Sequence, residues 1–350
     1  MEVSNELYKM LDLLIRPGFC AEDHKIVYCN TAAQALLLLP GTDVRDLLLT
    51  GQEEYDALAD GCLYLQLNLL PGGCGASVMV FGSQKIFLLD QTTDDDALQA
   101  LALAARELRQ PLAGIQALAS QLSVQTETDR EHLARLNRSI HQMLRLIGNM
   151  TDAGRSSTQS NLILRDIPKV ISEIFLRAQT LTEQAGTALH YQCTAESVLG
   201  LADEDQLERA ILNILSNAIK FSPKGSPIHA TLSRRGRTLM LRITDSGSGI
   251  AENLRENLFR RYLRQPGIED SRYGLGLGMV IVRNAAALHG GTVLLDQPEG
   301  SGTRVTMTLA IRQDTSSLRS PVLQVDYTGE LDHGLVELAD CLPLDVYFPN

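Results

Sequence analysis

The chain has 350 residues, of which 44% are apolar and 21% are charged. These proportions are typical of folded protein and exclude a collagen, a disordered tail or a bare coiled coil. The formal charge is −11, which argues against a general nucleic-acid binder because such a protein needs a basic face.

The acidic charge is unevenly distributed along the chain. Residues 1–92 contain 5 basic and 12 acidic residues, and residues 314–350 contain 1 and 7. The part between them is slightly basic, with 25 basic and 23 acidic residues. Together with composition and motifs, this divides the chain into four parts, at 1–92, 93–157, 158–313 and 314–350, the last an acidic C-terminal extension.

Targeting and redox signals are absent from the sequence. No apolar run reaches the ~18–20 residues that a membrane-spanning helix needs, and the first residues lack the pattern of a signal peptide. The six cysteines have neither CxxC nor metal-ligand spacing and are expected to be reduced core residues. We therefore expect a cytoplasmic protein without a transmembrane segment.

Residues 1–92 are expected to form a small α/β unit. Short strands are predicted at 25–29, 77–81 and 85–89, and a helix at 30–36. The stretch Tyr28-Cys29-Asn30-Thr31-Ala32-Ala33, between the first strand and the helix, resembles the start of a PAS sensor domain. An unrelated small α/β domain fits the same pattern.

Residues 93–157 are predicted to form two long helices. Apolar residues recur at alternating spacings of three and four, at Leu98, Leu101, Ala105, Leu108, Leu112, Ile115, Ala119 and Leu122, and then at Leu133, Leu136, Ile140, Met143, Ile147 and Met150. Thr128-Asp129-Arg130-Glu131 has the pattern of a capping box that begins the second helix. An antiparallel hairpin of this kind buries both flanks by dimerising into a four-helix bundle. The alternative is a monomeric hairpin that packs on its own neighbouring domains.

The first polar cluster of residues 158–313 lies on a helix predicted from Asp205 to Phe221. Asn213, Asn217 and Lys220 are spaced i, i+4, i+7 and therefore share one face of this mostly apolar helix. Buried amide and ammonium groups need polar partners, and phosphate oxygens with Mg²⁺ would satisfy them. A helix edge solvated by water is the alternative.

Three further clusters are rich in glycine. The cluster from Thr244 to Ile250 lies at a strand end. Asp245 can accept a hydrogen bond from a ligand amine there, while Gly247 and Gly249 let the backbone approach the ligand closely. Gly274-Leu275-Gly276-Leu277-Gly278 leads into an apolar helix whose first N–H groups form an anion site. Gly300-Ser301-Gly302-Thr303 precedes the last strand. No GxGxxG follows a strand, so a Rossmann domain is disfavoured.

In this order the clusters resemble the N, G1, G2 and G3 boxes of the histidine-kinase type of ATP-binding domain. Leu258-Phe259-Arg260-Arg261-Tyr262 supplies the F box. The hairpin resembles the dimerisation and phosphotransfer module that precedes this domain in sensor histidine kinases. The implied fold class is multi-domain α+β: a PAS-like domain, a two-helix hairpin that dimerises into a four-helix bundle, and an α/β sandwich of the histidine-kinase/chaperone ATPase type.

The resemblance implies ATP and Mg²⁺ as cofactors. Asn217 would bind Mg²⁺, Asn213 and Lys220 would contact the phosphates, and Phe221 would lie against the nucleotide. Asp245 would accept the adenine amino group. The pocket would be shaped by Gly247, Gly249, Gly274, Leu275, Gly276, Leu277 and Gly278, with Thr303 beneath it and residues 251–273 as a lid.

The resemblance also separates this site from that of a fast hydrolase. In the related chaperone, gyrase and mismatch-repair ATPases, the position of Asn213 holds a Glu that activates water. An Asn side chain cannot act as that general base. The site is therefore expected to be of the kinase type.

The phospho-acceptor position departs from the family. The stretch Ala105-Arg106-Glu107-Leu108-Arg109-Gln110-Pro111-Leu112 matches the family's S-H-E-L-R-T-P-L, except that Arg106 replaces the histidine. A guanidinium stays protonated and cannot attack a γ-phosphate as a neutral imidazole does. His132 and His141 lie on the second helix without this context, so we interpret both as surface residues.

Three functions are compatible with these residues. The chain is a sensor histidine kinase homologue that binds ATP–Mg without autophosphorylation at the usual position, a phosphatase toward a response regulator through Glu107 and Gln110, or a non-enzymatic dimeric scaffold gated by ATP. The expected partners are a second copy of the chain, through residues 93–157, and a response regulator receiver domain, with no nucleic acid. In the acidic extension a strand at 322–325 and a short helix at 331–338 are predicted, which dock on the ATP-binding domain or bind a partner.

Overall fold

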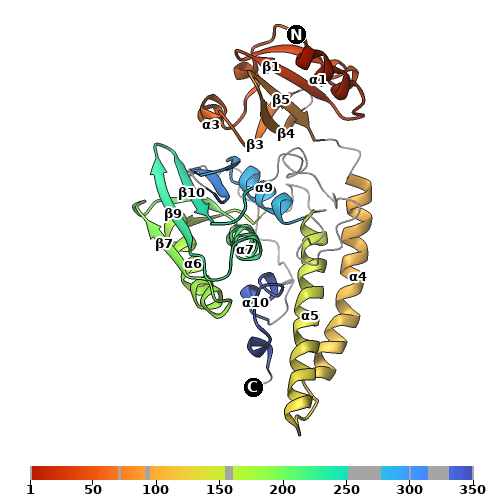
Figure 1. The fold of residues 1–350 in the computed structure, drawn as a ribbon, viewed down its shortest axis with the longest axis vertical. Coiled ribbons are helices and arrows are strands. Elements are labelled where there is room, and N and C mark those ends of the chain that lie inside the picture. The colour runs from red at the N-terminus through yellow and green to blue at the C-terminus, as the bar shows by residue number, and fades with distance from the viewer. Residues whose placement is uncertain are drawn as a thin grey trace.

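The computed structural model describes residues 2–69, 72–90, 95–153, 161–250, 277–298, 301–313 and 331–348. Figure 1 shows an N-terminal α/β domain, a pair of long antiparallel helices, a second α/β domain beside them, and a C-terminal segment (residues 331–348) that lies between the second domain and the helices. In the part of the chain described, no helix is long and apolar enough to cross a membrane.

The N-terminal domain is an antiparallel sheet of strand order β2-β1-β5-β4-β3 with short helices. Its elements are α1 (Glu2–Asp12), β1 (Gly18–Glu22), β2 (Lys25–Cys29), α2 (Thr31–Gln34), η1 (Val44–Leu47), α3 (Gln52–Ala57), β3 (Cys62–Leu69), β4 (Gly72–Phe81) and β5 (Gln84–Leu89). The three predicted strands are confirmed, whereas α1, β1 and β3 were not predicted. Asn30 begins α2 by accepting a hydrogen bond from the Ala33 N–H at 2.9 Å. The core is mainly aliphatic, with Phe19 stacked on Phe87 at its centre.

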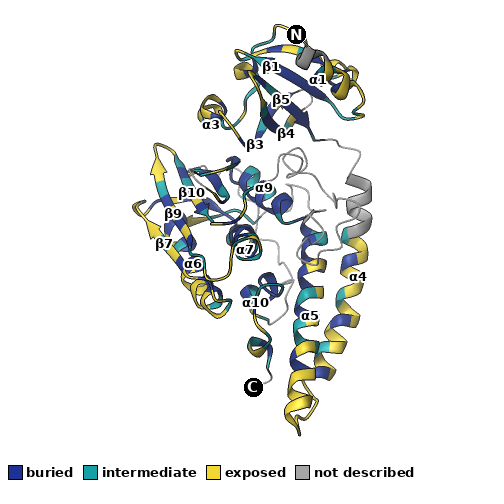
Figure 2. Ribbon diagram, in the orientation of Figure 1, coloured by how far each residue is buried: buried dark blue, intermediate teal, exposed yellow. Residues whose placement is uncertain are grey.

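The predicted hairpin is confirmed as α4 (Asp95–Ala119) and α5 (Glu127–Ala153). One row of its heptad stripe, Ala105, Leu112 and Ala119, is buried against α5. The alternate row, Leu108, Ile115 and Leu122, is between 44% and 59% exposed, and Figure 2 shows the exposed colour along much of α4. Of the stripe residues whose side chains the structure describes, a single chain thus buries three and leaves three exposed.

The predicted start of α5 is wrong by two residues. The reciprocal cap is formed by Thr126 and Asp129: the Thr126 hydroxyl accepts from the Asp129 N–H at 3.1 Å, and the Asp129 carboxylate accepts from the Thr126 N–H at 3.0 Å. A carboxylate three residues after a threonine satisfies the capping geometry whether it belongs to Asp or Glu, so the earlier pair begins the helix.

The second α/β domain packs helices on one face of a five-stranded sheet of order β11-β12-β10-β9-β7. Its elements are β6 (Ile163–Asp166), α6 (Ile167–Gln184), β7 (Leu189–Cys193), β8 (Leu199–Ala202), α7 (Glu204–Phe221), β9 (Ile228–Arg235), β10 (Thr238–Thr244), α9 (Gly278–Leu288), β11 (Val293–Asp296) and β12 (Arg304–Ala310). Burial alternates along β9, so one face of this strand is covered and the other faces solvent, whereas β12 is buried on both faces. Strands β6 and β8 form a separate pair.

The two α/β domains share one sheet, because β3 pairs antiparallel with β11. Tyr64 lies opposite Val293 in this pairing. Arg283 of α9 reinforces the junction: its guanidinium donates to Asp90 at 3.0 Å and lies 5.0 Å from the Tyr64 ring centroid. The Tyr64 hydroxyl donates to the same carboxylate at 2.8 Å. The N-terminal domain is thereby fixed to the second domain by strand pairing and a charged contact.

The C-terminal segment contains α10 (His333–Glu337) and η4 (Leu344–Tyr347). The short helix predicted there is confirmed, and the strand predicted at 322–325 lies outside the described residues. All six cysteines are free thiols. Cys193 is exposed, so the prediction that the cysteines are core residues fails at that position.

Candidate nucleotide site

The helix that contains the first polar cluster, α7, has a firmly fixed N-terminus. Asp203 is its N-cap: one carboxylate oxygen accepts from the Gln206 N–H at 3.2 Å and the other from the Asn161 N–H at 2.9 Å. The Asp203 N–H donates to Nε2 of the buried His289 at 3.0 Å. His289 Nδ1 lies 2.7 Å from the Ala285 carbonyl, so the ring is the neutral tautomer that donates from Nδ1. Burial lowers the pKa of His289 below its ordinary value of 6.5.

Asn213, Asn217 and Lys220 define the polar face of α7. Asn213 is buried, and its amide group donates to the Arg209 carbonyl at 2.9 Å and to a Glu337 carboxylate oxygen at 3.2 Å. The Lys220 ammonium donates to Asp340 at 2.7 Å. Asn217 is half-buried. Asn213 and Lys220 therefore have the polar partners that their chemistry required, and these include two carboxylates of the C-terminal segment.

The first and last glycine clusters meet at the end of α7. Asp245 accepts on Oδ1 from the backbone N–H groups of Gly247 at 2.7 Å and Thr303 at 3.0 Å. These two clusters are far apart in sequence but adjacent in space, because Thr244 pairs with Arg304 across β10 and β12. Burial raises the pKa of Asp245, and the hydrogen bonds from Gly247 and Thr303 partly offset that rise.

Close backbone packing explains the glycines of this corner. A Cβ on Gly247 would lie 2.8 Å from the carbonyl oxygen of Phe221, the last residue of α7. Gly302 has φ +115° and packs against the Asp245 carbonyl, and Gly249 has φ +78°. Phe221 itself is exposed. The structure thus brings Phe221, Asp245 and the glycine loops together, as the sequence indicated.

The start of α9 lies beside the polar face of α7. Leu277 is buried at the N-cap position, where it offers no side-chain acceptor, and a Cβ on Gly278 would lie 3.0 Å from Asn213 Oδ1. The first N–H groups of α9 are therefore near the Asn213 amide, as an anion site requires. Gly274, Leu275 and Gly276, the F box and the lid predicted at 251–273 lie outside the described residues.

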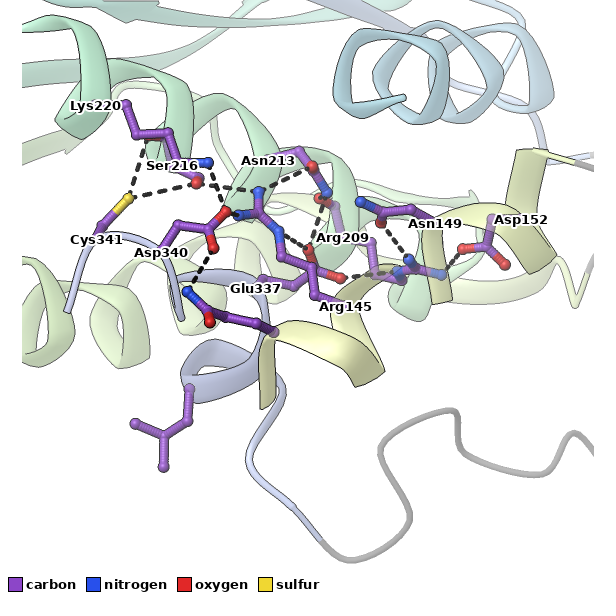
Figure 3. Close-up of polar contacts among 12 residues, drawn as sticks. Arg145, Asn149, Asp152, Arg209, Asn213, Ser216, Lys220, Glu337, Asp340 and Cys341 are labelled. Carbon is purple, nitrogen blue, oxygen red and sulfur yellow. Dashed lines mark hydrogen bonds and ion pairs between the residues drawn. The ribbon is translucent and has the colours of Figure 1, made fainter. Parts of the chain in front are cut away.

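Two buried arginines complete the charge of this region and were not predicted (Figure 3). Arg145 of α5 donates to the Ser216 hydroxyl at 3.0 Å and to Asp340 at 2.7 Å. Arg209 of α7 pairs with Glu337 at 3.2 Å and also with Asp152 of α5. Burial raises the pKa of Asp340, but Arg145 and Lys220 outweigh it, so the pKa lies below its ordinary value of 3.8. A sequence feature that could have indicated this cluster is the pair of acids Glu337 and Asp340, three residues apart in the acidic C-terminal extension.

The residues at the phospho-acceptor position are accessible. Ala105 is buried in the hairpin, whereas Arg106, Glu107 and Gln110 are exposed. His132 is exposed as predicted, but the prediction of a surface residue is wrong for His141. Its Nδ1 lies 2.7 Å from the Asn137 carbonyl and its ring meets Tyr347 edge-on, because the C-terminal segment covers this part of α5.

A magnesium site made by protein side chains alone is not found, since the described residues contain no group of three or more His, Cys, Asp or Glu placed to hold a metal ion. Mg²⁺ commonly keeps several waters and binds substrate phosphates with few protein ligands. The single amide oxygen of Asn217 fits that mode, in which the metal arrives with the nucleotide.

Comparison with known proteins identifies both central domains. The family HisKA, described as the His Kinase A (phospho-acceptor) domain, matches residues 97–159. The family HATPase_c, described as the histidine kinase-, DNA gyrase B- and HSP90-like ATPase, matches residues 202–313.

Individual relatives agree. The sensor-like histidine kinase SenX3 of Mycolicibacterium smegmatis is 28% identical over 62% of this chain and 58% of its own length. The sensor protein QseC of Salmonella typhi is 33% identical over 54% of this chain and 42% of its own length. The structure of full-length ShkA in complex with AMPPNP has a TM-score of 0.51 at 23% identity, over 63% of this chain and 47% of that one, which supports the fold. The chain thus matches less than two thirds of each relative.

Proposed function

Because the chain belongs to the sensor histidine kinases, with a HisKA domain followed by a histidine-kinase-type ATPase domain, we propose that it binds ATP–Mg in the second α/β domain. The observation that supports this most directly is the convergence of Asp245, held by Gly247 and Thr303, with the polar face of α7 and the start of α9. A carboxylate at one end suits the adenine amine, and the amide, ammonium and helix N–H groups at the other suit phosphates.

We further propose that this protein does not autophosphorylate at the usual position. Arg106 is exposed on α4 next to the buried Ala105, which is where an acceptor would have to be. A guanidinium group has no lone pair for attack on phosphorus. ATP binding would then act as a signal in its own right, with the N-terminal domain as the sensor that is joined to the ATPase domain through β3 and β11.

Homodimerisation is part of this proposal. Leu108 and Ile115 on α4, and Leu122 just beyond its end, are exposed in a single chain although they have heptad spacing. A second hairpin would bury these residues and form the four-helix bundle.

A phosphatase is the second candidate, because Glu107 and Gln110 are both exposed and lie one helical turn apart on α4. A receiver domain docked on α4 would place its phosphoryl group within reach of these side chains. The Gln110 carboxamide would orient a water molecule for attack, with Glu107 as a hydrogen-bond partner.

Incubation of the purified chain with γ-labelled ATP and Mg²⁺ tests the proposal. We expect bound nucleotide and no acid-labile phosphate on the protein, and we expect Arg106→His to gain labelling. Labelling of the natural chain would disprove the loss of the acceptor. Asn217→Ala is the control for binding. If neither it nor the natural chain binds nucleotide, ATP gating fails as well, and a non-enzymatic dimeric scaffold that reports a signal of the N-terminal domain is the remaining function. Dephosphorylation of a phosphorylated receiver domain that is lost in Gln110→Ala would establish the phosphatase.

A further inference from the structure

The C-terminal segment is built into the nucleotide-binding region rather than resting on its surface. Its apolar residues Leu338, Ala339 and Leu342 are buried at 0–1% exposure, in a cluster that also includes Ala134 of α5 and Ile219 of α7. Helix α5 adds polar contacts: Asn137 donates to the Tyr347 carbonyl, and Arg138 and Gln142 bond to residues 339 and 340. The segment therefore occupies a specific position between α5 and α7 (Figure 1).

The two carboxylates of this segment bind the side chains assigned to phosphate. The Asn213 amide has two N–H donors, and both are used, one by the Arg209 carbonyl and one by Glu337. A phosphate oxygen cannot accept a hydrogen bond from Asn213 while Glu337 is in place. The Lys220 ammonium is likewise engaged by Asp340 and largely buried.

The charge balance of the region points to an anion of higher charge. Three cations, Arg145, Arg209 and Lys220, lie within ion-pair distance of Glu337 or Asp340. Glu337 is fully buried, a position that a carboxylate tolerates only when it is paired and hydrogen-bonded (Figure 3). If the segment left, Arg209 would keep its partner Asp152, but Arg145 and Lys220 would lie on either side of Ser216 without the carboxylates they now contact, an arrangement that attracts a polyphosphate.

We propose that the C-terminal segment is an internal competitor of the nucleotide, in which Glu337 and Asp340 occupy the places of phosphate oxygens on the polar face of α7. This inference rests on the proposed ATP site and adds its regulation. Nucleotide binding and docking of the segment are mutually exclusive, so the apparent dissociation constant equals the intrinsic one divided by the undocked fraction. An undocked fraction of about one tenth would make the natural chain bind nucleotide about tenfold more weakly than an undocked chain.

The test compares three full-length proteins by titration calorimetry with Mg·ADP. Glu337→Gln/Asp340→Asn removes both charges with little change of shape, and Asp345→Asn is the matched control because Asp345 is an exposed acid of the same segment. We expect the double variant to bind Mg·ADP about tenfold more tightly than the natural chain and the control to bind equally. Adenosine, which has no phosphates, should show no such difference.

A chain that ends at residue 330 and the natural chain itself provide independent readouts. The truncated chain should bind Mg·ADP as tightly as the double variant, and saturating Mg·ADP should increase amide hydrogen exchange in residues 331–348 of the natural chain. Equal Mg·ADP affinity in all proteins, with unchanged exchange in the segment, would overturn the competition and leave the ATP site standing. If no protein binds Mg·ADP, the proposed function fails as well.

Discussion

The N-cap of α7 gives a prediction whose size follows from counted hydrogen bonds. Asp203 is 4% exposed, and its two oxygens accept from the N–H groups of Gln206 and Asn161. Asp203→Ala removes the cap, which costs about 1 kcal/mol, and leaves the second N–H without its partner, which costs about 1–3 kcal/mol. We expect a loss of ~2–4 kcal/mol in the free energy of unfolding of the second domain.

The matched variant is Asp203→Asn, which keeps one acceptor oxygen and is as good an N-cap as Asp. Asp203→Asn should lose about half as much free energy of unfolding, because its side-chain NH2 group faces one of the two N–H donors and cannot accept from it. At about 2–4 °C per kcal/mol for a domain of this size, Asp203→Ala should lower Tm by ~4–16 °C. The chain has no Trp, so differential scanning calorimetry or circular dichroism is the suitable measurement.

Nucleotide affinity provides a second test of the same reasoning. Asn213 is ten residues beyond the cap, which places it ~15 Å along the helix axis. Below its Tm, Asp203→Ala should therefore bind Mg·ADP as the natural chain does. The reasoning is refuted if the Ala and Asn variants unfold within about 0.5 kcal/mol of each other, or if the Ala variant loses binding while still folded.

Three further predictions concern pH, assembly and backbone conformation. Because burial lowers the pKa of His289, the unfolded chain takes up the proton first, so this contribution to stability is full above pH 6.5 and falls as the pH drops below that value. Urea midpoints measured at several pH values should show this fall. The fall should be smaller in His289→Gln and unchanged in the control His132→Gln. The double variant Leu108→Glu/Ile115→Glu should sediment as a monomer in analytical ultracentrifugation, whereas the natural chain should sediment as a dimer. The control Leu176→Glu, at a 70% exposed position of α6, should remain a dimer. A dimer that survives the double substitution would contradict the four-helix bundle. Gly302→Ala should destabilise the second α/β domain more than Gly225→Ala does. Both glycines have positive φ, but only Gly302 packs against neighbouring backbone. Equal urea midpoints for the two variants would contradict the close packing at Asp245.

Local patterns explain which elements were predictable from the sequence. The heptad stripe identified α4 and α5, because helical periodicity directly reports which face is buried. Short apolar runs next to turn residues identified β2 and β5. Strand β1 was missed since Gly18–Glu22 is buried at four of its five positions and shows no alternation. The shared sheet was also beyond prediction, because nothing local to β3 or β11 specifies a partner more than 200 residues away.

The candidate site divides in the same way. Asp245, Gly247 and Thr303 come together as expected, since each belongs to a loop whose residue types fix its conformation. The need of Asn213 and Lys220 for polar partners was also predictable from the sequence of α7 alone. The identity of those partners was not, because Glu337 and Asp340 are more than 100 residues away and become neighbours only through tertiary packing.

The kind of interaction that holds the C-terminal segment bears on why it is there. Replacing a buried ion pair by well-packed apolar residues is often neutral or stabilising, so charge is a poor choice for a segment that serves only to cover α7. Removing one partner of such a pair, in contrast, is costly because it leaves a buried charge uncompensated. Arg145 and Lys220 therefore need an anion beside them at all times, and the segment provides one through Asp340 whenever a polyphosphate does not. An apolar cover would seal the polar face of α7, whereas an acidic cover can be displaced by the ligand that the same cations attract.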